Sequence, residues 1–148
     1  MHYETSHHGY LISDDPAKLD LDVIHSYLRR SYWAKDIPRE IVEESVRHSL
    51  CLGIYTAESK QIGLVRLVTD YATFAWVCDV FVLEEHRGQG LSKIAIQAML
   101  AHPRLQTLRR FALATRDAHG LYRQFGFTPL FAPENQMEKR LRTSYSPS

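Results

Sequence analysis

The stretch that decides the fold is Val80-Phe81-Val82-Leu83-Glu84-Glu85-His86-Arg87-Gly88-Gln89-Gly90-Leu91-Ser92-Lys93. It begins as an apolar strand, passes through a polar turn that contains two glycines, and continues as an amphipathic helix. Unpaired N–H groups at a helix start carry partial positive charge, and glycines at 88 and 90 let the backbone approach a bulky anion. The stretch therefore predicts a diphosphate site, to which Arg87 and Lys93 add positive charge and Ser92 a hydroxyl.

Two other kinds of phosphate loop are excluded by the same residues. The stretch has neither the G-x-x-x-x-G-K-[ST] spacing of a P-loop nor the G-x-G-x-x-G spacing of a dinucleotide site. Taken alone, Gly88-Gln89-Gly90 is also compatible with a tight strand-to-helix turn that binds nothing. Residues outside the loop have to decide between these interpretations.

The rest of the chain supplies alternating strand and helix patterns around this stretch. Hydrophobic spacing, turn residues and prolines predict the order βααβββαβαββ. The predicted strands are 9–13, 50–56, 62–69, 73–83, 110–115, 127–132 and 137–141, and the predicted helices are 17–30, one opened by Pro38, 91–101 and 118–125. We therefore expect an α/β (α+β) fold, with a mixed, mostly antiparallel central sheet flanked by helices on both faces.

Bulk composition narrows the class of protein. The chain has 148 residues, 45% of them hydrophobic, and a formal net charge of +1. We expect one domain over residues 1–142 and a polar tail over 143–148. The near-neutral charge argues against nucleic acid as a partner, and no apolar run is long enough for a membrane span. The N-terminus lacks a leader pattern, so the cytoplasm is the expected location.

No metal site is expected. The sequence has no H-E-x-x-H motif and no close Cys/His spacing, and His7, His8 and His86 do not form a ligand set.

Two motifs together resemble the GCN5-related N-acetyltransferase (GNAT) family. Arg87-Gly88-Gln89-Gly90-Leu91-Ser92 is similar to the coenzyme A motif [RQ]-x-x-G-x-[GA], with the small residue Ser92 at its last position. The stretch Tyr122–Phe127 resembles the family's Y-x-x-x-G-F signature, and Met137-Glu138-Lys139 resembles its last strand. The resemblance covers roughly the whole chain and is strongest over residues 76–130.

The resemblance implies a GNAT-like acyl-CoA N-acyltransferase fold that binds acetyl-CoA. In the family, the pantetheine arm lies in a gap between two splayed strands and pairs with exposed backbone. Carried over, the backbone of Phe81 and Val82 would hold the pantetheine. The N–H groups from Arg87 to Ser92, including those of Gly88, Gln89, Gly90 and Leu91, would bind the pyrophosphate, with Lys93 beside them.

The resemblance also suggests catalytic residues. Tyr122 would be the general acid toward the departing thiolate, although its helical face also fits a packed core aromatic. Asp79, a carboxylate inside an apolar run, is the most conspicuous candidate for the base. It could instead accept hydrogen bonds from a neighbouring loop, and water could relay the proton to another group. Further candidates for the base are Glu84, Glu85, Asp70, Asp117 and His119.

The acceptor should be a primary amine, either a small molecule or a peptide. Aromatic and acidic residues on loops, namely Tyr32, Trp33, Asp70 and Tyr71, are expected to line its pocket. We thus expect an N-acetyltransferase that works by direct attack of the amine. The alternative is a non-catalytic acyl-CoA-binding or sensor module, for which a phenol at position 122 is unnecessary. Small enzymes of the family are often homodimers, so a homodimer is also an expectation.

Overall fold

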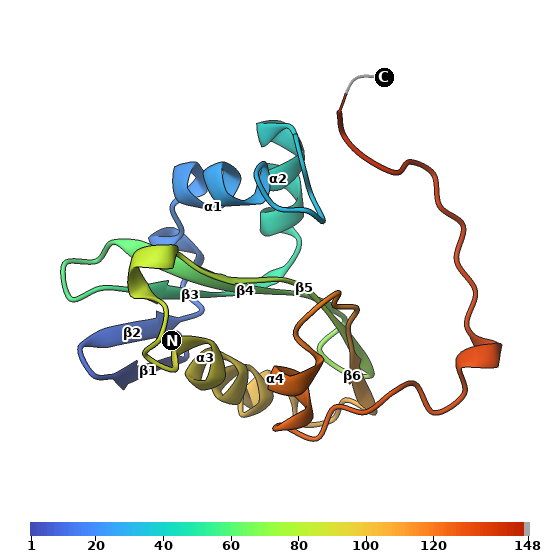
Figure 1. The fold of residues 1–148 in the computed structure, drawn as a ribbon. Coiled ribbons are helices and arrows are strands. Elements are labelled where there is room, and N and C mark those ends of the chain that lie inside the picture. Colours follow the sequence, from blue (N-terminus) through green and yellow to red (C-terminus); the bar gives the residue numbers. More distant parts are fainter. Residues whose placement is uncertain (147–148) are drawn as a thin grey trace.

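The computed structural model describes residues 1–146, which form a six-stranded mixed sheet with helices on both faces (Figure 1). The strands lie in the order β1-β2-β3-β4-β5-β6, and all neighbours are antiparallel except the parallel pair β5 and β6. The strands are β1 (Glu4–His7), β2 (Tyr10–Ser13), β3 (Leu50–Tyr55), β4 (Gln61–Thr69), β5 (Phe74–Val82) and β6 (Arg110–Ala112). The helices are α1 (Leu21–Leu28), α2 (Arg39–Arg47), α3 (Leu91–Leu100) and α4 (His119–Arg123).

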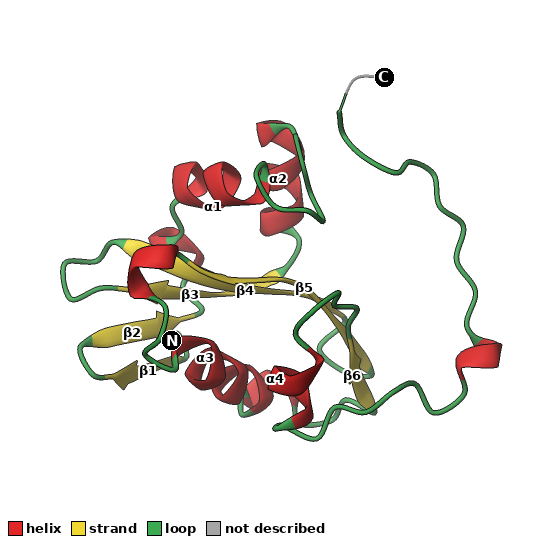
Figure 2. Cartoon of the chain, viewed as in Figure 1, coloured by secondary structure: helices red, strands yellow, loops and turns green. Residues whose placement is uncertain are grey.

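Each face of the sheet is covered by one pair of helices (Figure 2). Helices α1 and α2 cover one face, where Ile24, Val42 and Phe81 belong to one buried cluster. Helices α3 and α4 cover the other face, where Val65 and Ile96 belong to a second cluster. This confirms the expected mixed, mostly antiparallel sheet between two helical layers.

Local signals account for most element boundaries. Asp20 caps α1 by accepting hydrogen bonds from the N–H groups of Asp22 and Val23, so this helix starts later than its hydrophobic spacing predicts. Pro38 precedes α2, as expected. Gly126 has φ of +88° just after α4, the left-handed conformation expected at a helix C-terminus.

The N-terminal hairpin was not predicted in full. The sequence predicts one strand over 9–13, whereas β1 and β2 form a hairpin turned at His8 and Gly9. Both turn residues have positive φ, 47° and 83°, as a tight two-residue hairpin turn requires. Gly9 was the available signal for this turn.

The two predicted closing strands are the main error. Neither 127–132 nor 137–141 is a strand in the structure. After Phe127 the chain leaves the body as an extended segment, drawn in orange and red in Figure 1. We call residues 128–144 the arm. A strand needs a partner edge for its backbone hydrogen bonds, and the arm lies on none. The limit between domain and tail expected at residue 142 stays a prediction, and residues 147–148 of that tail lie outside the described residues.

No helix among the described residues has both the length and the hydropathy of a membrane span.

Candidate functional site

The gap between β5 and β6 is the centre of the site. The two strands pair in parallel only from Phe74 to Trp76 on β5, opposite Arg110 to Ala112 on β6. Beyond Trp76, no described strand pairs with this edge of β5. The chain after β6 instead diverges, and a pocket of about 580 Å³ lies between residues 76–80 and 113–118. We call it the splay pocket. Its open strand edge is the kind of surface to which an extended ligand can add.

The alternation of backbone directions decides which groups face this open edge. The N–H of Leu83 donates to the carbonyl of Ile62 on β4 at 2.8 Å, so the backbone of Phe81 faces β4 as well. The backbone groups of Val80 and Val82 therefore face the open edge. Of the two residues expected to hold pantetheine, Val82 is well placed and Phe81 is not. The backbone of Val80, which the sequence analysis did not name, also faces the open edge.

A β-bulge turns Asp79 toward the α1–α2 face of the sheet. Arg66 pairs with Asp79 and Leu67 with Val77, which leaves Cys78 as the extra residue. Without it, Asp79 would face the α3 side together with Val77. The bulge thus places a carboxylate beside the splay pocket and opposite Arg66 on the same face.

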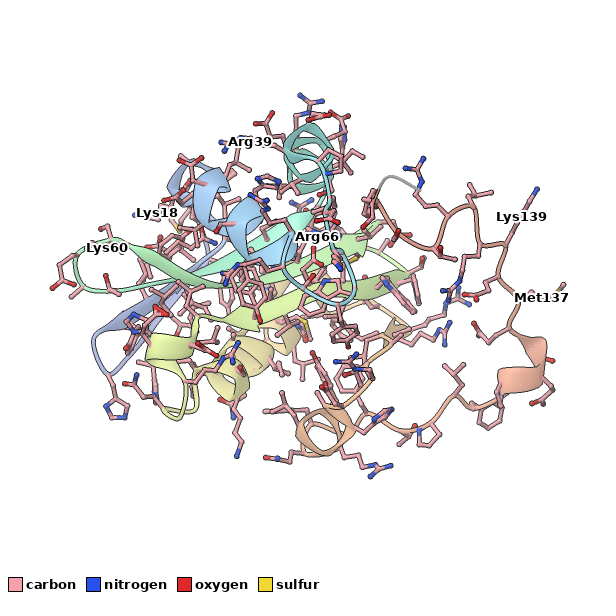
Figure 3. The ribbon with its side chains drawn as sticks, turned by 45° about the horizontal axis from the view of Figure 1, so that its top comes forward. Lys18, Arg39, Lys60, Arg66, Met137 and Lys139 are labelled. Atoms are coloured by element: carbon pink, nitrogen blue, oxygen red, sulfur yellow. The ribbon has the colours of Figure 1, made fainter. Side chains whose placement is uncertain are left out.

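Both oxygens of Asp79 accept hydrogen bonds. The indole N–H of Trp33 donates to Oδ1 at 2.7 Å, and Nε of Arg66 donates to Oδ2 at 2.6 Å. Asp79 is 4% exposed, and Arg66 also donates to Ser49 Oγ at 2.9 Å. Figure 3 shows Arg66 beneath the loop between α1 and α2. The bond from Trp33 is the hydrogen bond from a neighbouring loop that sequence reasoning left open.

The loop between α1 and α2 crosses the gap. While Trp33 bonds to β5, Tyr32 reaches the other side: its hydroxyl accepts a hydrogen bond from the N–H of Arg116 at 3.2 Å. The guanidinium of Arg116 stacks on the Tyr32 ring at 3.8 Å. Both aromatic residues line the splay pocket. The structure therefore brings these two predicted acceptor residues together at the site.

Asp70 and Tyr71 lie elsewhere, in the turn between β4 and β5. The Thr73 hydroxyl and the N–H groups of Ala72 and Thr73 donate to Asp70, and these bonds lower the pKa of its carboxyl. Tyr71 lies under the guanidinium of Arg104, 3.7 Å from its ring centroid. Neither residue lines the splay pocket. Asp70 shapes its own turn, a common use of aspartate that the sequence does not distinguish from a ligand site.

Tyr122 lies on α4, is 7% exposed and lines the splay pocket. It packs edge-on against Phe127 at 5.5 Å, so it is also a core aromatic residue. Its hydroxyl has no hydrogen-bond partner in the described part of the chain. Burial, with a smaller contribution from Tyr32, raises the pKa of Tyr122 to about 12. The phenol is therefore protonated at neutral pH and free to donate into the pocket.

The glycine loop, Arg87–Lys93, has the geometry of an anion site. Gly88 and Gly90 have φ of 83° and 75°, and Gly90 is the left-handed cap that starts α3. No side chain caps this helix, and within residues 1–146 the backbone N–H groups from Gly88 to Lys93 have no protein acceptor. An added Cβ at either glycine would meet no atom within 4 Å. The loop thus presents a row of unpaired donors beside open space, which fits a pyrophosphate.

Hydrogen bonds to three elements, β5, α1 and β2, hold the loop in place. Nε of Arg87 donates to the carbonyl of Val82 at 2.9 Å, and its Nη2 donates to the Tyr27 hydroxyl on α1 at 3.1 Å. The amide of Gln89 donates to the Tyr10 hydroxyl on β2 at 3.1 Å, and this hydroxyl also bonds to His86 Nδ1 at 2.8 Å. Two residues expected to touch the cofactor therefore use their side chains to fix the loop, and the backbone is left to bind the anion.

Among the described residues, no group of three or more His, Cys, Asp or Glu side chains could hold a metal ion.

Comparisons with known proteins agree with this geometry. The sequence model of the acetyltransferase (GNAT) family matches residues 17–127. A candidate acetyltransferase of Gibberella zeae is 34% identical, with 76% of this chain and 75% of that protein covered. The crystal structure of a candidate GNAT acetyltransferase from Xanthomonas campestris pv. campestris is 47% identical and covers 97% of this chain and 99% of its own, with a TM-score of 0.90.

More distant structures share only the fold. A Staphylococcus aureus protein with a TM-score of 0.71 is 20% identical and covers 88% of this chain and 98% of its own. The family match spans both the glycine loop and Tyr122. The chain therefore belongs to the acetyltransferase (GNAT) family.

Proposed function

We propose that this protein transfers the acetyl group of acetyl-CoA to a primary amine by direct attack of the amine. Three features carry the proposal: the open edge of β5, the glycine loop that follows β5 in the chain, and a phenol in the pocket beside β5. They present the unpaired N–H groups of the glycine loop, the open backbone edge of Val80 and Val82, and the free hydroxyl of Tyr122. They match the pyrophosphate, the pantetheine and the sulfur of one extended molecule.

When bound, acetyl-CoA supplies an activated acyl carbon and a thiolate leaving group. The glycine loop would bind its pyrophosphate, and the open edge of β5 would hydrogen-bond its pantetheine amides. The amine enters from the side of the α1–α2 loop, where Tyr32 and Trp33 form the wall. The new C–N bond forms as the C–S bond breaks, and the sulfur leaves toward Tyr122.

Tyr122 would donate its phenolic proton to the departing sulfur. A pKa of about 12 exceeds the roughly 8.5 of an ordinary thiol in water, which makes the transfer unfavourable in solvent. The same burial affects a thiolate, however, since burial raises the pKa of the Cys51 thiol in this protein to about 12. Burial of the departing sulfur beside Tyr122 would raise the basicity of the thiolate in the same direction, which favours general acid catalysis by the phenol.

Asp79 is assigned a positioning role in this proposal. Its two oxygens already accept from Trp33 and Arg66, so an incoming ammonium would have to compete with both donors. Asp79 instead holds the aromatic wall over the gap, and the proton of the amine leaves through water. The sequence analysis put this residue forward as a base. The variant Asp79→Asn distinguishes the two roles, because it keeps an acceptor for Trp33 but cannot take up a proton. Its activity should be retained if Asp79 only positions Trp33 and lost if Asp79 is the base.

The test is steady-state release of free thiol from acetyl-CoA with a panel of aromatic, aliphatic and peptide amines. Tyr122→Phe should lower kcat by about 10²–10³-fold and leave acetyl-CoA affinity within about twofold. The matched control is Tyr3→Phe, which removes a phenol hydroxyl far from the gap. An unchanged kcat in Tyr122→Phe would refute the role of the phenol. Binding of acetyl-CoA without turnover on any amine would favour the non-catalytic acyl-CoA module.

A further inference from the structure

Three aromatic side chains stand exposed at the mouth of the splay pocket. Tyr32 is 49% exposed, Trp33 39% and Trp76 39%, and all three line the pocket. Val68, which pairs with Trp76 across the sheet, is 50% exposed. We call Tyr32, Trp33 and Trp76 the aromatic rim. Large aromatic rings left in water beside a pocket are typical of a ligand surface rather than of a core.

The aromatic rim lies on the face of the sheet that α1 and α2 cover. Val77 belongs to the cluster on the α3 face, so the alternation of side chains along β5 turns Trp76 to the opposite face. Trp76 is also the last residue of β5 that pairs with β6, so the gap begins next to it. Figure 1 shows this end of β5 beyond α2. Tyr122 comes from α4 on the other face. The rim and the phenol therefore face the gap from opposite sides of the sheet.

Polar contacts hold the two rings that come from the loop between α1 and α2. The indole N–H of Trp33 donates to Asp79, and the hydroxyl of Tyr32 accepts from the N–H of Arg116. The two rings meet edge to face, with centroids 5.1 Å apart and an angle of 80° between their planes. These bonds fix the orientation of the rings, and both rings stay partly exposed. An aromatic surface fixed in advance loses little side-chain entropy when a flat ligand packs on it.

The charges that line the splay pocket do not select a polycation or an anion. The charged lining residues are two arginines and two aspartates, namely Arg66, Arg116, Asp79 and Asp117. Their formal charges sum to zero, and both oxygens of Asp79 are already bonded. A polyamine would need several unpaired carboxylates to hold its ammonium groups. The aromatic rim is therefore the feature of the pocket that can distinguish one amine from another.

We propose that the amine acetylated by this protein is a small arylalkylamine, and that the aromatic rim binds its ring. The proposal rests on the acetyl transfer proposed above and names its acceptor. The ring packs against Trp33 and Trp76, and the alkyl chain carries the amine into the gap toward the thioester. Aromatic pairs of this kind favour offset-stacked or edge-to-face contacts. The sulfur leaves toward the opposite face, where Tyr122 lies.

The pocket fits a small molecule better than a peptide. Its volume of about 580 Å³ lies within the range of small-molecule sites, roughly 300–1,000 Å³. A peptide would lay several backbone amides across the rim, and each amide that is taken from water needs a hydrogen-bond partner. Two of the three polar groups of the rim, the Trp33 N–H and the Tyr32 hydroxyl, are already bonded within the protein.

Titration calorimetry tests the binding of the ring without acetyl transfer. The protein is titrated with phenethylamine, 2-cyclohexylethylamine and n-butylamine, with and without coenzyme A, which has no acetyl group to transfer. Phenethylamine should bind at least about tenfold more tightly than butylamine, and about threefold more tightly than the cyclohexyl amine, which has the area but no π face. Because the rim is formed by the protein alone, the preference should appear under both conditions. Equal affinity of the wild type for the three amines would overturn the proposal.

The variant Trp76→Leu identifies the residue that sets the preference. In steady-state acetyl transfer it should raise KM for phenethylamine about tenfold, with kcat within about twofold, and leave KM for butylamine within about twofold. Trp33 is less suitable, because its replacement also leaves Asp79 without a donor. The matched control is Phe74→Leu, which changes an aromatic residue on the same strand and face but outside the splay pocket. It should match wild type with both amines.

The remaining outcomes separate the ring site from the acetyl transfer. An unchanged KM for phenethylamine in Trp76→Leu would overturn the assignment of the rim. A peptide with an N-terminal phenylalanine, or spermidine, acetylated about tenfold more efficiently than phenethylamine would overturn the choice of a small arylalkylamine. Selective binding of phenethylamine without turnover of any amine would refute the acetyl transfer and support the ring site.

Discussion

The glycine loop and the arm are both exposed segments next to the same sheet, but they are held in different ways. The loop is fixed by Arg87 and Gln89, whose side chains reach a carbonyl of β5 and hydroxyls on α1 and β2. The arm has no bond to the body between its ends. The loop is thus complete within one chain and offers unpaired donors to a small ligand. The arm leaves several large apolar side chains exposed, and its backbone hydrogen bonds are local turns.

The largest expected effect is on the free energy of unfolding, and it comes from the buried ion pair between Arg66 and Asp79. Asp79→Ala should lower the free energy of unfolding by about 3–5 kcal/mol, because it leaves the Arg66 guanidinium buried without its partner. The double variant Arg66→Met, Asp79→Leu should recover most of this loss. Urea denaturation of the three proteins measures it. A single variant as stable as wild type would show that the pair is not buried in solution.

Alkaline pH should also lower the free energy of unfolding. Burial raises the pKa of Cys51 and of Tyr122 to about 12, and raises that of Tyr55 as well. A raised folded pKa gives stability that is complete below the unfolded pKa, roughly 8.5–10, and is lost as pH rises toward the folded one. The free energy of unfolding should therefore fall between about pH 9 and 12.

The contribution of Tyr122 to this loss is on the order of 2 kcal/mol. Urea denaturation at a series of pH values should accordingly show a shallower decline in Tyr122→Phe than in wild type. These three groups belong to the packed body, so removing residues of the arm should not change the slope. Equal slopes for Tyr122→Phe and wild type would show that this phenol does not stay protonated above its ordinary pKa.

Removing a side-chain contact of the glycine loop should weaken acetyl-CoA binding moderately. Gln89→Ala removes the bonds to the Tyr10 hydroxyl and the His86 carbonyl but leaves the backbone donors in place. Since one hydrogen bond is worth roughly 1 kcal/mol, acetyl-CoA should bind about fivefold more weakly. The matched control Gln97→Ala changes the same residue type farther along α3. Equal affinities for both variants would mean that the loop needs no side-chain support.

Removal of the arm should have the smallest effect on acetyl-CoA binding. A chain that ends at residue 128 should bind acetyl-CoA within about twofold of wild type, because none of the donors of the glycine loop lies in the arm. A large loss of acetyl-CoA affinity would show that the two regions are coupled.

The two regions also differ in how well the sequence predicts them. The conformation of the glycine loop is local: Gly88 and Gly90 provide positive φ, and the pattern after them starts a helix. The strand pattern over 127–141 is just as local, but a strand forms only where an edge pairs with it, and none of the described strands pairs with these residues. The sequence therefore predicts which residues favour a strand and not whether an edge of a sheet pairs with them.

The candidate site shows the same limit. Tyr122, Trp33 and Tyr32 were predicted and meet at one pocket. Val80 was missed because the bulge at Cys78 and the register with β4 determine which amides face the gap. Neither the bulge nor the register can be predicted from the local hydrophobic pattern. Asp70 lies in a turn that it shapes, away from the pocket, and the sequence does not distinguish such an aspartate from one that binds a ligand.

The central claim is that acetyl-CoA binds along the glycine loop, and titration calorimetry with Gly90→Trp tests it most directly. An indole at position 90 would fill the open space in front of the unpaired N–H groups. Gly126→Trp is the matched control, since Gly126 also has positive φ and open space but lies outside the splay pocket. We predict that wild type and Gly126→Trp bind acetyl-CoA and that Gly90→Trp does not. Absence of binding to folded wild type, or equal binding to Gly90→Trp, would contradict the account.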